Sequence, residues 1–130
     1  MKYLLDTHLL LWIATAPNHL SKATLKILED DHNECWFSAA SLWEIVIKNG
    51  LGRADFHIEP NVFRRGLLDN GYFELAIKSE HTIMVGTLPP IHKDPFDRIL
   101  IAQALLEGFI LLTNDSVLTQ YTGSIQLVQS

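Results

Sequence analysis

The sequence predicts an α/β fold, a three-layer α/β/α sandwich around a central parallel β-sheet of four to five short strands. Short apolar runs alternate with segments of helical periodicity along the 130 residues, which is typical of a sheet covered by helices on both faces. The composition agrees, since 48% of the residues are hydrophobic and 19% are charged, as in a packed domain. Chains of this length form one domain, so we expect residues 1–130 to be a single unit.

Five short segments have the pattern of β-strands. Most are continuous apolar runs, which indicates strands buried on both faces, while residues 72–77 alternate apolar and polar residues. In chain order the expected strands lie at residues 2–5, 35–37, 72–77, 109–112 and 125–128. Because helical segments separate them, we expect them to pair in parallel.

Capping residues and the spacing of apolar residues predict the helices. Ser21 and Ser38 are typical N-cap residues, and Asp94 precedes a proline at the first helical position. Prolines and glycines mark the expected ends, for instance Gly50 and Gly52 after the third helix. The expected helices lie at residues 7–16, 22–28, 39–49, 61–69, 79–88, 95–107 and 115–121.

Charge and cysteine content exclude several classes of protein. The net charge is −5, whereas a protein that binds nucleic acid mainly by neutralising phosphates is basic. Cys35 stands alone, which excludes an intramolecular disulfide and a cysteine-based zinc site. Asp6 interrupts the apolar N-terminal run, which argues against a signal peptide, and no apolar stretch reaches the ~18 residues of a membrane span. We therefore expect a soluble, cytoplasmic protein that does not contact a membrane.

Acidic residues adjoin the strands at one edge of the expected sheet. Asp6 directly follows the first strand, Glu44 lies on the helix after the second, and Asp115 follows the fourth. Asp94 and Asp97 lie at the start of the long helix before that fourth strand. Because ligands of parallel sheets bind at the carboxyl ends of the strands, we expect these acids to converge.

Converging carboxylates need neutralisation, because two unit charges 4 Å apart repel by ~4 kcal/mol at an effective dielectric constant of 20. Either some of the acids are protonated, with raised pKa values, or a divalent cation holds them. Oxygen ligands without cysteine or paired histidine favour Mg²⁺ or Mn²⁺ over zinc. Such a cation also supplies the positive charge that the chain lacks, and it supports hydrolysis of a phosphodiester. We predict metal-dependent phosphodiester hydrolysis.

Each of these acids also has an ordinary structural interpretation. Asp94 is a good helix N-cap, and Asp97 lies in a first helical turn, where the helix dipole favours an acid. Asp115 can cap the short helix that follows it, and Glu44 can lie on a solvated face. This interpretation is weakest for Asp6, which apolar residues flank on both sides. The shared edge of the sheet carries the prediction, rather than any single acid.

Other residues are weaker candidates for a site. No two of the six histidines have the spacing of a zinc site. His8 and His92, which lie near the acids, are either proton carriers or, as we prefer, structural or surface residues. The seven glycines are scattered, which excludes phosphate-binding and dinucleotide-binding loops. Trp12 and Trp43 are interpreted as core or dimer packing. Four basic residues form either a rim for a phosphate backbone or solvated helix faces: Lys48, Arg53, Arg64 and Arg65.

Four blocks of sequence, in this order and at these intervals, resemble the PIN-domain family, and more narrowly the VapC-type toxins of bacterial type II toxin–antitoxin systems. They are LLDTHLLLW, SAASLWEIVIK, HKDPFDRILIAQA and LLTND. The resemblance extends from Lys2 to Asp115 and implies a PIN-like fold. It further implies an endoribonuclease toxin that hydrolyses RNA by metal-activated water, with one or two Mg²⁺ or Mn²⁺ ions per site, and that a cognate antitoxin neutralises. It also implies a homodimer, with which the apolar composition agrees.

The same resemblance assigns the site residues. Four acids match the family's catalytic and metal-binding positions: Asp6, Glu44, Asp97 and Asp115. Thr113 matches a hydroxyl position that orients a site acid or a water, and Asp94 is either an additional ligand or, as we prefer, only the helix cap. The mechanism that this implies is in-line attack on the phosphodiester, which leaves a 3′-hydroxyl and a 5′-phosphate.

Three alternatives compete with this interpretation. A noncatalytic PIN-fold binding module is the main one, and the presence of all four acids argues against it. A phosphatase of the haloacid dehalogenase type needs a second acid two residues after the first aspartate, where this chain has His8. A receiver-type signalling domain needs paired acids near the N-terminus and a late lysine, and the sequence shows neither.

Overall fold

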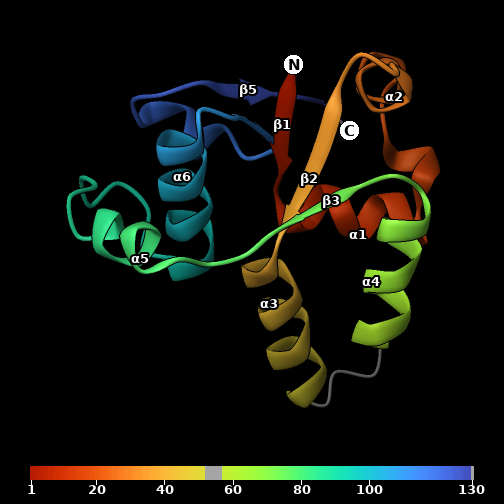
Figure 1. The fold of residues 1–130 in the computed structure, drawn as a ribbon, viewed down its shortest axis with the longest axis horizontal. Coiled ribbons are helices and arrows are strands. Elements are labelled where there is room, and N and C mark those ends of the chain that lie inside the picture. Colours follow the sequence, from red (N-terminus) through yellow and green to blue (C-terminus); the bar gives the residue numbers. More distant parts are fainter. Residues whose placement is uncertain (52–56, 130) are drawn as a thin grey trace.

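A computed structural model describes residues 1–51 and 57–129. Arg53 of the predicted basic rim and the predicted helix stop at Gly52 lie outside the described residues. The described chain forms a five-stranded parallel sheet with helices on both faces, which confirms the predicted three-layer sandwich (Figure 1). None of the described helices is long and apolar enough to cross a membrane.

The sheet has the strand order β3-β2-β1-β4-β5, and all of its pairs are parallel. The strands are β1 (Lys2–Leu5), β2 (Glu34–Ser38), β3 (Phe73–Leu75), β4 (Ile110–Thr113) and β5 (Ile125–Leu127). The N-terminal strand is therefore the centre of the sheet, between β2 and β4. The prediction of a strand over residues 72–77 was too long, because Leu75 pairs with Ser38, the last residue of β2, and the edge strand ends with its partner.

The helices are α1 (Thr7–Thr15), α2 (Lys22–Glu29), α3 (Ala39–Gly50), α4 (Pro60–Asp69), α5 (Ser79–Val85) and α6 (Pro95–Glu107). Two short 3₁₀ helices, η1 (Pro17–His19) and η2 (Ser116–Gln120), complete the described elements. The side chains of Ser21, Ser38 and Asp94 each accept a hydrogen bond from the backbone of the next helix, as predicted. Helix α5 ends at Val85 and not at the predicted residue 88. The guanidinium of Arg98 binds the carbonyl oxygen of Val85, the last residue of the helix, and that of Leu88 in the turn that follows, which explains the earlier end.

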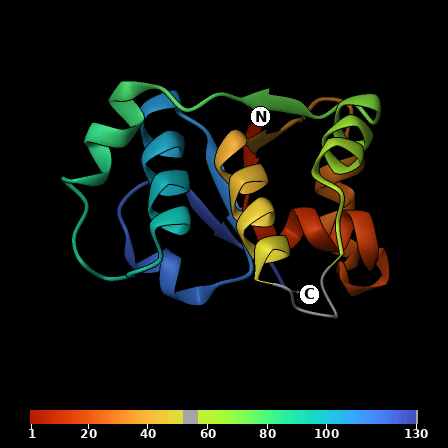
Figure 2. The ribbon, with the colours of Figure 1, turned by 90° about the horizontal axis from the view of Figure 1, so that it is seen from below.

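Two apolar clusters fill the space on the two sides of the sheet. One packs α1, α2 and α4 against β1 and β2, with Leu9, Phe37 and Phe63 among its members. The other packs α6 against β1 and β4, with Leu100 and Leu111 at its centre. Figure 2 shows the sheet between these two layers, viewed at right angles to Figure 1. Packing on both faces explains why the central strands are continuous apolar runs.

A buried polar network joins α5 and α6 to the end of β2. Gln103 is fully buried, and its side chain accepts a hydrogen bond from Ser38 (2.6 Å) and donates to the carbonyl of Ala76 (3.3 Å). Fully buried His81 accepts from the backbone of Lys78 through Nδ1 (3.0 Å), and its Nε2 donates to Glu107 (2.8 Å). The network ties the start of α3 to the middle of α6, the two helices that carry candidate site acids.

Replacing Gln103 by leucine is expected to lower the free energy of unfolding by about 1–3 kcal/mol, because the substitution leaves buried polar groups without partners. Urea unfolding of Gln103→Leu measures this loss, and Gln120→Leu is the matched control, since Gln120 is exposed. Equal stability of the two variants would contradict a structural role for the network.

Candidate active site

The predicted acids converge in one pocket at the carboxyl ends of β1 and β4. The pocket has a volume of about 150 Å³. Its lining contains all four acids of the predicted set, together with Asp94, three polar neighbours and one lysine: Asp6, Thr7, His8, Glu44, Lys48, Asp94, Asp97, Asn114 and Asp115. The topology explains this convergence, because β1 and β4 are neighbours and α3 and α6 pack against each other beside them.

Asp6 is held rigidly at the base of the pocket. It is 4% exposed, and its backbone N–H still donates to Leu112 of β4 (3.0 Å). Its carboxylate caps α1 by accepting from the N–H of Leu9 (2.9 Å) and also accepts from the hydroxyl of Thr113. Burial raises the pKa of Asp6 above its usual value, against the lowering effect of these hydrogen bonds. Sequence reasoning did not foresee this cap, although an aspartate directly before a helix is its usual signal.

Thr113 connects two of the acids. Its buried hydroxyl donates to Asp6 and accepts from the backbone N–H of Asp115 (3.0 Å). Oδ1 of Asp115 caps η2 by accepting from Val117 (3.0 Å), while Oδ2 faces the pocket. The capping interpretation of Asp115 therefore holds for one carboxylate oxygen, while the other is directed into the pocket.

Burial and neighbouring carboxylates both act on the pKa of Asp97. Burial, and after it the charge of Asp94, raises the pKa of Asp97 to about 7, although His92 opposes the shift. Asp94 forms the predicted helix cap by accepting from Phe96 (2.8 Å). Burial and the neighbouring negative charges therefore both favour the protonated form of Asp97 over its ionised form.

Glu44 points into the pocket and not into solvent, so the alternative of a solvated face was wrong. The exposed positions of α3 are those of Trp43, Val46 and Ile47 instead. Glu44 forms an ion pair with Lys48, one turn further along α3, at 3.2 Å. Trp43 is 59% exposed and contacts Phe96 edge-on, whereas Trp12 packs against the core, as one of its two interpretations predicted.

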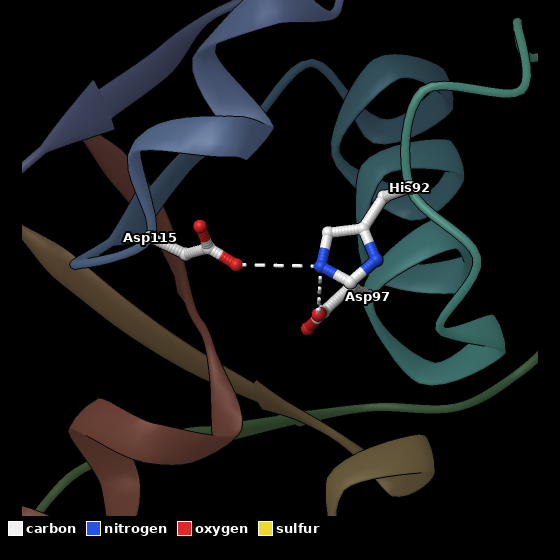
Figure 3. Close-up of side chains that lie close together, drawn as sticks. All are labelled: His92, Asp97 and Asp115. Atoms are coloured by element: carbon white, nitrogen blue, oxygen red, sulfur yellow. Dashed lines mark ion pairs between the residues drawn. The ribbon is translucent and has the colours of Figure 1, made fainter.

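His92 lies between two of the acids. Its Nε2 is 3.3 Å from Oδ2 of Asp97 and 3.3 Å from Oδ2 of Asp115, as Figure 3 shows. Its Nδ1 accepts from the backbone N–H of Asp94 (3.1 Å), which leaves Nε2 as the ring nitrogen that faces the two carboxylates. The sequence analysis preferred a structural or surface role for this residue over that of a proton carrier. Its position depends on the loop before α6, which no local pattern reveals.

Arg98 holds that loop in place. Its guanidinium donates to the carbonyl oxygens of Val85, Leu88, Pro89 and His92 and to the hydroxyl of Tyr121. Arg98 directly follows Asp97 in the sequence, yet its hydrogen bonds go to the loop. The basic residue that neutralises an acid of the pocket is Lys48.

The donor set of the pocket fits Mg²⁺ or Mn²⁺. Carboxylate oxygens from four separate elements face one small volume, and hard oxygen donors suit these two ions. His92, Asp97 and Asp115 also place one ligand atom each within 4.8 Å of one another.

The fold and the pocket define an α/β/α protein with an acidic site at the carboxyl edge of a parallel sheet. The family model of the PIN domain matches residues 3–123. The chain belongs to the PIN-domain family, which confirms the predicted resemblance. No curated protein sequence matches the chain.

Solved structures of VapBC complexes share the fold. One is VapBC2 from Rickettsia felis bound to a promoter DNA fragment, with a TM-score of 0.75, 15% identity, and coverage of 99% of this chain and 100% of the other. Another is DNA-bound VapBC from Salmonella typhimurium (TM-score 0.65, 17% identity, coverage 98% and 96%). A third is VapBC-1 from nontypeable Haemophilus influenzae (TM-score 0.62, 17% identity, coverage 98% of both chains). At these identities the likeness shows a common fold.

Proposed function

We propose that this PIN-domain protein is a VapC-type toxin, an endoribonuclease that depends on Mg²⁺ or Mn²⁺ and is neutralised by a cognate antitoxin in the cytoplasm. The observation that carries the proposal is the convergence of Asp6, Glu44, Asp97 and Asp115 in one pocket of a PIN fold. A noncatalytic module has no need to maintain so much like charge in one place.

The chain's residues have distinct parts in this proposal. Asp97, Asp115 and Glu44 would offer carboxylate oxygens to one or two cations, and Asp6 would complete the set from the base of the pocket. Thr113 fixes the position of Asp6 relative to the backbone of Asp115, because its hydroxyl donates to the one and accepts from the other. When bound, the cation supplies an activated water and neutralises charge on the phosphoryl group.

The antitoxin is supported by the similar structures, which are of toxin–antitoxin assemblies. A second, larger hollow of about 760 Å³ lies between α1, α2 and α4, with a mainly apolar lining that includes Leu25, Val62 and Phe63.

A homodimer is supported by large apolar side chains on α3 that are exposed to solvent, among them Trp43 and Val46. Gel filtration at micromolar concentration tests the dimer, and a strictly monomeric mass would contradict it.

The decisive experiment is incubation of purified protein with a labelled RNA pool in the presence of Mn²⁺ and, in parallel, of EDTA. We expect discrete products with 3′-hydroxyl and 5′-phosphate ends that disappear in EDTA. Products that persist in EDTA would contradict metal dependence. Absence of both cleavage and Mn²⁺ binding would favour the noncatalytic module.

A further inference from the structure

The acidic pocket contains one strongly basic side chain. Of the described residues that line it, Lys48 is the only lysine or arginine, and it faces five carboxylates. The sequence offers three further basic residues, either as a rim for a phosphate backbone or as solvated helix faces. Among those, Arg64 is engaged by Glu74 through two hydrogen bonds of 2.8 and 2.9 Å, and Arg65 lies on α4, outside the pocket.

Lys48 holds its position loosely. Its Nζ pairs with Oε2 of Glu44 at 3.2 Å, and 37% of its side chain is exposed, against 12% for Glu44. A partly exposed ion pair one helical turn apart adds little to stability, because water screens it and the lysine stem loses conformational freedom. The lysine can therefore leave Glu44 at small cost.

A cation in the pocket would force such a move. The carboxylate of Glu44 is part of the proposed metal-binding set, and a divalent cation there repels the ammonium group at the same oxygen. The displaced lysine would remain at the mouth of a pocket whose four proposed ligands carry more negative charge than one divalent ion neutralises.

An RNA phosphate adds further negative charge to this pocket. The net charge of the whole chain is −5, so a long-range field does not attract the substrate. Arg98 is occupied by the loop before α6. A local cation beside the metal-binding acids is therefore what a phosphate needs, and Lys48 is placed to supply it.

We propose that Lys48 is a substrate-binding residue that exchanges partners, from Glu44 in the metal-free protein to a phosphate oxygen of the RNA once a cation occupies the acids. This inference rests on the proposed function and deepens it. It predicts that Lys48 opposes metal binding and favours RNA binding. A lysine that only pairs with Glu44 also opposes the cation, but it leaves the affinity for RNA unchanged.

The test compares the wild type with Lys48→Met, which keeps the stem but removes the charge, and with Lys48→Arg, which keeps the charge. Lys78→Met is the matched control, because Lys78 pairs with Glu107 at 3.9 Å and does not line the pocket. Mn²⁺ affinity is measured by isothermal titration calorimetry, and KM and kcat are measured with a single-stranded RNA that the wild type cleaves. Circular dichroism melting verifies that each variant is folded.

For Lys48→Met we expect Mn²⁺ to bind several-fold more tightly and KM for RNA to rise by ~10-fold or more, as for the loss of a charge-assisted contact. Lys48→Arg should keep KM close to that of the wild type, and Lys78→Met should match the wild type in both Mn²⁺ affinity and KM. Unchanged Mn²⁺ affinity would overturn the exchange of partners, and unchanged KM would overturn the phosphate contact. A wild type that cleaves no RNA refutes the proposed function instead, and the Mn²⁺ titration then still decides whether Lys48 competes with the cation.

Discussion

Asp97→Asn is expected to reduce RNA cleavage by more than the ~10–100-fold that is typical of losing an outer-shell partner of a metal site. The amide has nearly the shape of the carboxylate, but it removes a negative charge from the acidic pocket in which we propose that a cation binds. Asp6→Asn should have an effect of similar size and keeps an oxygen for the cap of α1. Initial rates with Mn²⁺ measure both losses.

The control for these variants is Asp31→Asn, because Asp31 is exposed and does not line the pocket. Alanine is a poorer probe at position 6, since it removes the capping oxygen and leaves Thr113 without its acceptor. A cleavage rate for Asp97→Asn equal to that of Asp31→Asn would contradict the assignment of the active site.

The second large effect concerns the stability of the metal-free protein, which is expected to fall as the pH rises from about 4 to about 7. In the folded state the pKa of Asp97 is raised from 3.8 to about 7. Between these values the folded protein keeps a proton that the unfolded chain has lost, so each pH unit costs up to ~1.4 kcal/mol of unfolding free energy. The raised pKa of Asp6 acts in the same direction.

Urea unfolding in EDTA at several pH values measures this slope. Asp97→Asn should flatten the slope and make the metal-free protein more stable than the wild type at neutral pH, because the amide does not ionise. Saturating Mn²⁺ should oppose the fall, since the cation binds the deprotonated acids. A wild-type slope unaffected by the substitution would show that Asp97 does not titrate in this range.

The order and type of the elements could be predicted because local rules determine them. Continuous apolar runs identified the central strands, and the side chains of Ser21, Ser38 and Asp94 identified three helix starts. The length of β3 could not be predicted, because an edge strand extends only as far as its partner pairs with it. The end of α5 likewise depends on Arg98, thirteen residues further along the chain than Val85.

The candidate acids were predictable because each follows or adjoins a strand that ends at one edge of the sheet. The two basic side chains that pair with these acids, His92 and Lys48, could not be predicted. His92 reaches Asp97 and Asp115 through a loop that Arg98 and Tyr121 hold. Lys48 was one of four basic residues with equivalent local patterns, and only the direction of α3 turns it toward the acids.

By itself, the sequence determined the layered α/β architecture and the acidic character of the site. These follow from periodicity, capping and the chemistry of residue types, which act over a few neighbouring residues. The tertiary structure alone decided which oxygens of Asp6 and Asp115 are used for capping, why the pKa of Asp97 is raised and where Lys48 points. Those properties depend on distances and burial between residues that are far apart in the chain.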